Sequence, residues 1–393
     1  MSESRSPIPV VLLAGFLGSG KTTLLNHLLR RNQGNRIGVV VNDFGAIEID
    51  AMTVAGQVGS TVSLGNGCLC CAVDVGELDD YLDKLTRPEA RIDVIVVEAS
   101  GLAEPQELVR MILASDNPRI EYGGLAEVVD AAEFGATRAR HPEIDRHLAI
   151  ADLVVLNKTD RVDAAAVERL RTEIGELCGG TPVVETRYGR IDPALLLDAA
   201  LRPGPEDAVR QLSFEDLYAE AYDAEHGHDP GHDAHLHTAY ESVSFETATP
   251  LHPRRLMDFL DTRPPGLYRI KGHVDFGACD PRNRYTVHAV GRFLRFHPEP
   301  WPEDGSRATR LVLIGSGLDT GGLRARLGAC ALRGDAHDVP DERSMWGVLR
   351  WVPGDADGPE GWEEPPGPGP SGAEGRPAGA DRPDPPRAAP VPG

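Results

Sequence analysis

A glycine-rich octapeptide near the N-terminus constrains the fold of this chain more than any other feature. Residues 15–22 read GFLGSGKT, directly after the apolar run 8–14 and directly before a helix-like stretch. In that context the loop lets backbone N–H groups close on phosphate oxygens, while its lysine reaches the β- and γ-phosphates and its hydroxyl ligates Mg²⁺. The run predicts a nucleoside triphosphate site formed by Gly15, Gly18, Ser19, Gly20, Lys21, Thr22 and Thr23, with Lys21 also acting in catalysis.

The sequence Asn157-Lys158-Thr159-Asp160 indicates which base is bound. It follows the apolar strand candidate 153–156. The Asp160 carboxylate can accept two hydrogen bonds from guanine, while Asn157 can reach the other edge of the base and the Lys158 stem can lie on the ring. Adenine would leave the carboxylate unpaired, a mismatch that discriminates by about 10⁴. The predicted nucleotide is therefore GTP.

A third nucleotide motif follows the apolar run 92–98. Glu98 ends that run and is placed to hold Mg²⁺ together with Thr22, and the Gly101 N–H can meet the γ-phosphate. The next residue is Leu102, so the water-positioning glutamine of small GTPases is absent at this point. We expect GTP hydrolysis with slow intrinsic turnover, on the order of 10⁻² per second or below.

Three of the six cysteines lie within four residues, at Cys68, Cys70 and Cys71. They offer two or three thiolates to one soft ion, whereas tetrahedral zinc takes four ligands. Asp43, Glu48, a histidine, water or a recipient protein can supply the rest. Two other interpretations stay open, a redox thiol pair and cysteines that pack as small hydrophobic groups.

The order of these motifs resembles that of the CobW family of P-loop GTPases. It runs GFLGSGKT, NDFG at 42–45, CLCC, EASGLAEP at 98–105 and NKTD, and segments 242–245, 268–272 and 311–315 resemble the family's smaller C-terminal domain. The resemblance covers residues 8 to 352 and implies metal handling, chiefly delivery of zinc or cobalt to a client metalloprotein. Relatives include the accessory GTPases of urease, hydrogenase and nitrile hydratase.

Some positions depart from the family pattern. Asp43, a predicted catalytic residue, stands where relatives usually have glutamate, and Ala99 replaces a commoner hydroxyl residue. The loop 185–189, where a second guanine contact is expected, is not a clear match. Nucleotide specificity is therefore expected to depend mainly on Asn157 and Asp160.

Charge and cysteine usage limit the partners and the compartment. The chain has 393 residues with 40 basic and 61 acidic side chains, a net charge of −21, so we expect neither a nucleic-acid nor a membrane partner. Residues 1–9 lack a signal-peptide core, and no apolar run of about 18 residues exists. We expect a cytoplasmic protein with reduced thiols. A homo-oligomer stays open.

The alternation of strand-like and helix-like segments predicts an α/β fold. We expect a P-loop GTPase domain with a mostly parallel sheet at 1–202, an acidic linker at 203–240, a smaller α+β domain at 241–352 and a disordered tail at 353–393. The strand candidates of the first domain are 8–14, 36–42, 92–98, 125–130, 152–157 and 182–185.

The linker is rich in histidine, with five of the thirteen histidines in twelve residues. They can serve as auxiliary ligands that feed metal to the thiolates. These residues are His226, His228, His232, His235 and His237. In the C-terminal domain, Arg269, Lys271 and His273 lie on one strand-like face, which can meet a partner, the GTPase domain or solvent.

The motifs together predict a GTP-hydrolysing metallochaperone that binds zinc, with cobalt next, and transfers it to a client. GTP with Mg²⁺ would order the loops around Asp43 and Gly101 and so fix the thiolates between them. Two alternatives stay open. One is a GTP-regulated metal buffer or sensor without a client, and the other is a GTPase with redox-active cysteines.

Overall fold

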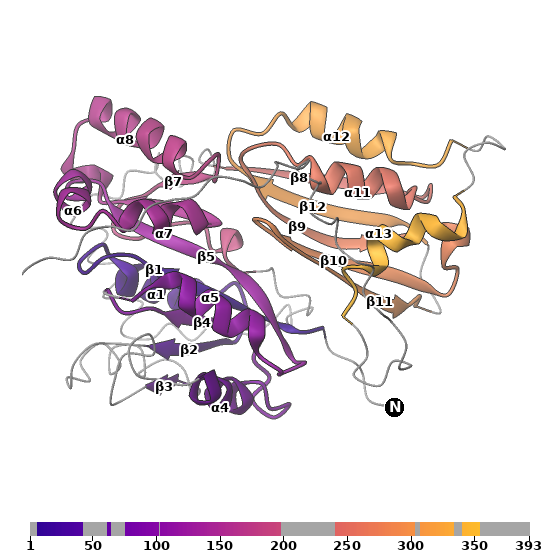
Figure 1. The fold of residues 1–393 in the computed structure, drawn as a ribbon, viewed down its shortest axis with the longest axis horizontal. Coiled ribbons are helices and arrows are strands. Elements are labelled where there is room, and N and C mark those ends of the chain that lie inside the picture. The colour runs from indigo at the N-terminus through magenta and orange to yellow at the C-terminus, as the bar shows by residue number, and fades with distance from the viewer. Residues whose placement is uncertain are drawn as a thin grey trace, which may run out of the picture. The chain divides into compact units, whose positions relative to one another are not determined.

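The computed structural model describes residues 6–41, 61–63, 75–101, 103–197, 240–302, 307–333 and 340–353. The first half contains a seven-stranded sheet in the order β3-β2-β4-β1-β5-β6-β7, and every strand pair in it is parallel (Figure 1). The strands are β1 Ile8–Ala14, β2 Ile37–Val41, β3 Thr61–Ser63, β4 Val94–Glu98, β5 Ile120–Asp130, β6 Leu153–Asn157 and β7 Val183–Glu185.

The six predicted strands of this sheet are confirmed, with two differences. The short edge strand β3 was not predicted, and β5 begins at Ile120 rather than at residue 125. The early part of β5 contains Glu121 and two glycines, and the pairing of β5 with β1 shifts register there, between Val10 and Val11. A bulge with polar residues hides the alternation that marks a strand in sequence.

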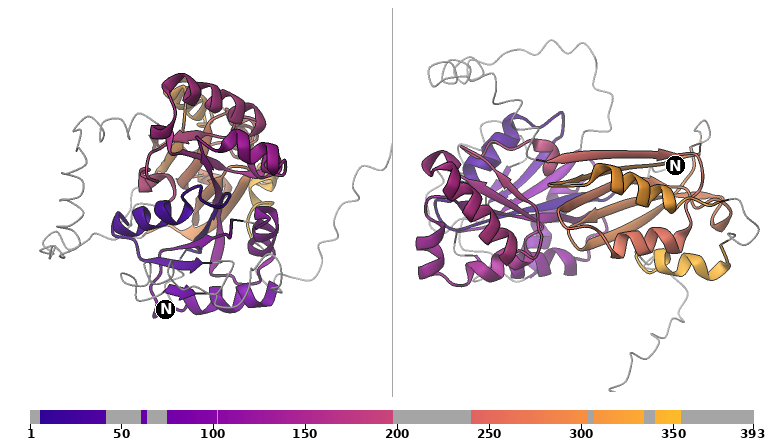
Figure 2. Two further views of the ribbon diagram at one scale, coloured as in Figure 1. Left: turned by 90° about the vertical axis from the view of Figure 1, so that its left-hand side faces the viewer. Right: turned by 90° about the horizontal axis from the view of Figure 1, so that it is seen from above.

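Helices cover both faces of the parallel sheet (Figure 2). Alternate residues of β1 show why, because Val11 and Leu13 pack with the leucines of α1, whereas Val10 and Leu12 pack with those of α4 and α5. The helices are α1 Lys21–Arg30, α4 Val75–Leu85, α5 Pro105–Ala114, α6 Phe134–Arg140, α7 Ile144–Ile150 and α8 Ala164–Leu177, with 3-10 turns η1 Thr159–Arg161 and η2 Pro193–Leu195.

The C-terminal part is an antiparallel sheet in the order β11-β10-β9-β12-β8. Helices pack on one of its faces over a separate apolar core (Figure 2). The strands are β8 Glu241–Thr247, β9 Leu267–Val274, β10 Asn283–Val290, β11 Phe293–Pro300 and β12 Thr309–Gly315, and the helical segments are α11 Pro253–Asp261, η3 Gly277–Cys279, α12 Thr320–Ala329, η4 Glu342–Met345 and α13 Trp346–Leu349. The predicted α/β and α+β classes are confirmed.

The two sheets are packed together within one unit that extends to Pro353. Tyr268 of β9 and Val290 of β10 belong to the apolar core that contains α1. Gly124, at φ +109° in the bulge of β5, makes room for them, since a side-chain carbon there would lie 2.6 Å from Val290 Cγ1. Arg269 donates from Nη1 to Leu196 O at 3.1 Å. Of the three surroundings considered for this strand face, a partner, the GTPase domain or solvent, Arg269 therefore contacts the GTPase domain.

The predicted division of the chain stays a prediction, because residues 198–239 and 354–393 lie outside the described ranges. The expected linker and the expected disordered tail fall there. Within the described residues, no helix is both long enough and apolar enough to cross a membrane.

Candidate functional site

The three nucleotide motifs meet at one edge of the parallel sheet. β1 ends at Ala14, directly before the glycine-rich loop, β4 ends at Glu98 and β6 ends at Asn157. Because the strands are parallel, their carboxyl ends lie side by side, which is where an open α/β sheet binds its ligand. The polar side chains are therefore brought together by strand order and not by proximity in sequence.

The conformation of the phosphate loop depends on its glycines. Gly15, Gly18 and Gly20 have φ values of +140°, +79° and +105°. A side-chain carbon at Gly15 would collide with Val128 O, and one at Gly20 would collide with the Asn157 amide. Only glycine allows both the left-handed backbone and the close approach of β5 and β6.

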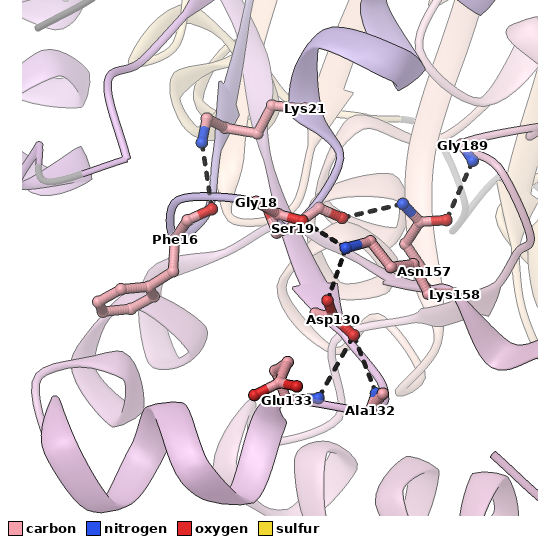
Figure 3. A network of polar contacts seen from close by, with 10 residues as sticks. All are labelled: Phe16, Gly18, Ser19, Lys21, Asp130, Ala132, Glu133, Asn157, Lys158 and Gly189. Atoms are coloured by element: carbon pink, nitrogen blue, oxygen red, sulfur yellow. Dashed lines mark hydrogen bonds and ion pairs between the residues drawn. The ribbon is translucent and has the colours of Figure 1, made fainter. Parts of the chain in front are cut away.

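Lys21 begins α1 and lies across the loop that precedes it. Its ammonium donates to Gly15 O at 2.8 Å and to Phe16 O at 3.3 Å, and the residue is only 7% exposed (Figure 3). Ser19 is also buried, and its hydroxyl makes no hydrogen bond within the described residues. The loop thus carries a buried cation and a buried hydroxyl that suit an anionic ligand.

Thr22 and Glu98 are joined directly. The Thr22 hydroxyl donates to Glu98 Oε1 at 2.7 Å, and Glu98 is 6% exposed at the end of β4. Two oxygen donors from separate elements fit Mg²⁺, which prefers oxygen ligands and keeps several waters. The loop after Glu98 also packs on the phosphate loop, since a side-chain carbon at Gly101 would lie 2.7 Å from Leu17 N.

Asn157 connects two loops through both ends of its amide. Nδ2 donates to Ser19 O at 2.9 Å, and Oδ1 accepts from Gly189 N at 3.0 Å (Figure 3). Asn157 is 1% exposed, and both ends of its amide bind protein atoms, so its predicted contact with the guanine edge stays a prediction. Asp160 is exposed and is the NKTD side chain left for the base.

Lys158 bridges the NKTD motif to the phosphate loop. Its Nζ donates to Gly18 O at 2.6 Å and to Asp130 Oδ2 at 2.7 Å. Sequence reasoning did not select Asp130, although it shares one signal with Glu98, an acid that ends an apolar strand candidate. The loop 185–189 also lies beside the motif, because Thr186 O accepts hydrogen bonds from the N–H and hydroxyl of Thr159.

Glu127 is a second acid that sequence reasoning missed. It is fully buried in β5, and neither carboxyl oxygen makes a hydrogen bond within the described residues. His147 Nδ1 lies 3.9 Å away. Burial raises the pKa of Glu127 to about 8, against the opposing charge of Lys21. The available signal was a lone acid inside the apolar run that ends at Asp130.

The predicted transition-metal ligands, the possible ligand Glu48 and one catalytic residue fall outside the described residues, whereas the predicted Mg²⁺ ligands Thr22 and Glu98 lie within them. In the described ranges, no group of three or more His, Cys, Asp or Glu side chains is arranged to hold a metal ion. The predictions that lie outside are Asp43, Cys68, Cys70, Cys71, His226, His228, His232, His235 and His237.

A parallel sheet that presents a lysine-bearing phosphate loop and an NKxD sequence at the same edge is the arrangement of a P-loop GTPase. Models of known families match the chain as the CobW/HypB/UreG nucleotide-binding domain over residues 9–185 and as the cobalamin synthesis protein cobW C-terminal domain over residues 240–331. The chain therefore belongs to the CobW family of GTPases.

Three curated relatives support this assignment. The chain is 30% identical over 364 residues to a zinc chaperone CobW of Sinorhizobium sp, covering 83% of this chain and 98% of the relative. It is 32% identical to the zinc chaperone CobW of Pseudomonas aeruginosa, covering 83% and 92% of the two chains. The zinc chaperone YjiA of Escherichia coli is 32% identical, with 49% and 62% covered.

Among solved structures, Zn(II)-bound YjiA GTPase from E. coli aligns with 83% of this chain and 99% of that chain, at 22% identity and a TM-score of 0.39.

Proposed function

We propose that this protein is a GTP-driven metallochaperone that binds zinc at Cys68, Cys70 and Cys71 and passes it to a client protein. The observation that carries the proposal is the nucleotide edge of the sheet, in a chain that also has three cysteines in four residues. Relatives named zinc chaperones over most of this chain support zinc as the cargo. Cobalt is the next candidate, because thiolate and imidazole ligands alone do not separate the two metals.

The nucleotide part of the proposal assigns a role to each group at that edge. Gly15, Gly18, Ser19, Gly20 and Thr23 would surround the phosphates with backbone N–H groups, Lys21 would neutralise the β- and γ-phosphates, and Asp160 would read guanine. Asn157 and Lys158 would hold the loops in place. Thr22 and Glu98 would hold Mg²⁺, which supplies charge neutralisation on the phosphates when it is bound.

The coupling of nucleotide to metal would operate through the same edge. The segment with the cysteines follows Ser63, the last residue of β3, and the segment with Asp43 follows Val41, the last residue of β2. Both segments therefore leave the sheet at the edge that carries the phosphate loop. Gly101, packed on Leu17, would report the γ-phosphate to its own loop. Metal would tighten GTP by the same factor by which GTP tightens metal.

We assign the remaining parts to supply and delivery. The histidines of the proposed linker, 203–240, would collect metal, and the C-terminal domain, 241–352, would recognise the client. The reduced thiols that the site needs suit the cytoplasm.

The test is a competition titration of zinc and cobalt against a chelator, in the presence of a Mg²⁺·GTP analogue or of Mg²⁺·GDP. We expect tighter metal binding in the triphosphate state for the intact protein and loss of that difference in Cys70→Ser. Cys178→Ser is the matched control, because Cys178, the residue directly after α8, has a buried thiol whose pKa burial raises to about 12. Equal affinities in both nucleotide states would contradict delivery and favour a buffer or sensor.

A further inference from the structure

Asp130 lies beside Lys158 of the guanine motif, and the Lys158 ammonium lies between Asp130 and Gly18 of the phosphate loop (Figure 3). We propose that Asp130 is a positioning residue for nucleotide binding, which holds the Lys158 ammonium on Gly18 O and so fixes the guanine motif against the phosphate loop. This inference deepens the nucleotide part of the proposed function and rests on it.

The position of Asp130 follows from strand register. Asp130 is the last residue of β5 and pairs with Asn157, the last residue of β6. Because the two strands are parallel, their carboxyl ends are neighbours, and Lys158 comes next in the chain. Lys158 has φ +59°, a left-handed conformation that is costly for a residue with a side chain and that concentrates at functional sites.

The two carboxylate oxygens of Asp130 have different partners. Oδ1 accepts from the backbone N–H groups of Ala132 at 2.9 Å and Glu133 at 3.3 Å, in the turn that leads into α6. Oδ2 accepts from Lys158 Nζ at 2.7 Å. The turn therefore fixes the carboxylate, and the fixed carboxylate can then hold the lysine.

The ion pair is shielded enough to be effective. The side chains of Asp130 and Lys158 are 10% and 27% exposed. A charge-assisted hydrogen bond of this length in such surroundings is stronger than one on the open surface, where long side chains lose entropy for little gain. Asp130 thus restricts a flexible four-carbon stem before any ligand arrives.

The phosphate loop needs this support at Gly18. Among the described residues, a side-chain carbon at Gly18 would meet no atom within 4 Å, so none of their side chains packs on the loop at that point. The bond from Lys158 Nζ to Gly18 O, at 2.6 Å, supplies a fixed point there. Asp130 therefore acts through Lys158 on both the base side and the phosphate side of the site.

The test is Asp130→Asn, because asparagine keeps an oxygen for the turn and removes the charge. We expect the Kd for a fluorescent GDP analogue and the KM for GTP to rise by about 10-fold, the factor that ~1.4 kcal/mol represents. We expect kcat at saturating GTP to stay within about 2-fold, because the contacts of Asp130 are with the turn before α6 and with Lys158 of the guanine motif. A purely structural role would lower the active fraction and leave KM unchanged.

Asp163→Asn is the matched control. Asp163 caps α8 by accepting from Ala166 N at 2.7 Å, the same capping chemistry without a nucleotide motif in contact. We expect its Kd to equal that of the wild type. Asp130→Ser, which can also cap the turn, serves as a second variant if Asp130→Asn does not fold.

A double-mutant cycle with Lys158→Met isolates the pair. If Asp130 acts through Lys158, Asp130→Asn has less than about 2-fold further effect in the Lys158→Met background. Full additivity, or a Kd for both Asp130 variants within about 2-fold of the wild type, would overturn the inference alone. A wild-type protein without nucleotide affinity would overturn the proposed function as well.

Discussion

Two buried carboxylates on one strand behave in opposite ways. Glu121 lies near the start of β5, where the C-terminal sheet docks, and Glu127 lies near its end, beneath the phosphate loop. They are 6% and 0% exposed. The pKa of Glu121 is lowered, whereas the pKa of Glu127 is raised to about 8. Burial alone therefore does not decide the charge of either group.

At the start of β5, which we call the docking end because the C-terminal sheet packs there, the partners of Glu121 explain its lowered pKa. Burial by itself would raise its pKa, but His288, the bond from His297 and the Lys271 ammonium outweigh burial and lower it. His297 Nε2 lies 3.2 Å from Glu121 Oε2, and His288 Nδ1 lies 3.5 Å from Oε1. His288 also donates from Nε2 to Tyr122 O at 2.9 Å. The contact between β5 and the C-terminal sheet thus surrounds Glu121 with partners, although His288 Nδ1 makes no hydrogen bond within the described residues.

Glu127 has no such set of partners at the nucleotide end. Burial raises its pKa, and the Lys21 charge opposes the rise only in part. A carboxyl with a pKa of about 8 is mostly protonated at neutral pH and so does not neutralise the positive charge of Lys21. The start of β5 thus holds a carboxyl with nearby partners, whereas its end holds a buried carboxyl without hydrogen bonds in the described residues, an arrangement that costs stability.

The largest effect should come from removing the charge at the nucleotide end. We expect Lys21→Ala to lower kcat/KM for GTP by about 100-fold or more, because transition-state charge loses a preorganised cation. Steady-state GTP hydrolysis measures it. Lys84→Ala, which removes an ammonium that lies over the Tyr81 ring in α4, is the control and should change little. Comparable losses in both variants would contradict a specific role for Lys21.

Glu127→Gln should reverse the usual sign of a core substitution. The folded pKa of about 8 lies above the ordinary 4.5, so the unfolded chain gives up this proton first and the free energy of unfolding falls as pH rises between those values. Glutamine does not titrate, so this fall in the free energy of unfolding disappears. The free energy of unfolding of the variant should therefore exceed that of the wild type by ~2 kcal/mol at pH 8.5 and by much less near pH 5.

Urea unfolding at the two pH values measures this effect. Glu168→Gln, at a side chain 63% exposed on α8, should show no such pH dependence. A Glu127→Gln variant that is less stable than the wild type at pH 8.5 would mean that the carboxyl is ionised and paired.

Glu121→Gln should destabilise the protein, in contrast to Glu127→Gln. Losing the ionised partner of His297 and of the Lys271 charge should lower the free energy of unfolding by about 1–2 kcal/mol at pH 7, where His288, whose pKa burial lowers to about 4, is neutral. Because the folded pKa is lowered, this stability is present above the ordinary pKa of 4.5 and is lost as pH falls through the folded value. The gap between variant and wild type should therefore narrow toward pH 3.

Glu246→Gln is the control for that measurement. Glu246 pairs with Arg310 at 2.8 Å on the exposed side of β8, where its side chain is 62% exposed. A pair of this kind contributes about 0–1 kcal/mol. Equal losses in Glu121→Gln and Glu246→Gln would contradict the special position of Glu121.

The smallest effect should come from Tyr122→Phe. The Tyr122 hydroxyl donates to Asp152 Oδ2 at 2.5 Å, and Asp152 Oδ2 also accepts from Leu125 N. Removing the hydroxyl should cost ~1 kcal/mol in thermal unfolding and leave kcat and KM for GTP unchanged. Burial raises the pKa of Asp152 to about 6 and the Tyr122 bond lowers it, so the variant should raise it further. A change in KM would show that the docking end acts on the nucleotide end.

Much of the nucleotide edge could be predicted because its signals are local. The glycines and Lys21 are contiguous in sequence. Glu98 and Asn157 each end an apolar run, and such a run both forms a buried strand and can be recognised in the sequence. Asp130 and Glu127 were missed because neither belongs to a motif. Asn157 was recognised, but not its use of both amide ends within the protein, since Ser19 is 138 residues away in sequence.

Short stretches of sequence are enough to predict the phosphate loop, the six strands and the family, because backbone conformation and side-chain alternation are properties of short segments. Which buried acids are charged depends instead on contacts between distant segments. Glu121 meets His297 across 176 residues, whereas Glu127 meets no hydrogen-bond partner within the described residues. The ionisation of a buried group depends on the groups that the fold brings within a few ångströms of it, and the residues adjacent in sequence do not reveal which groups those are.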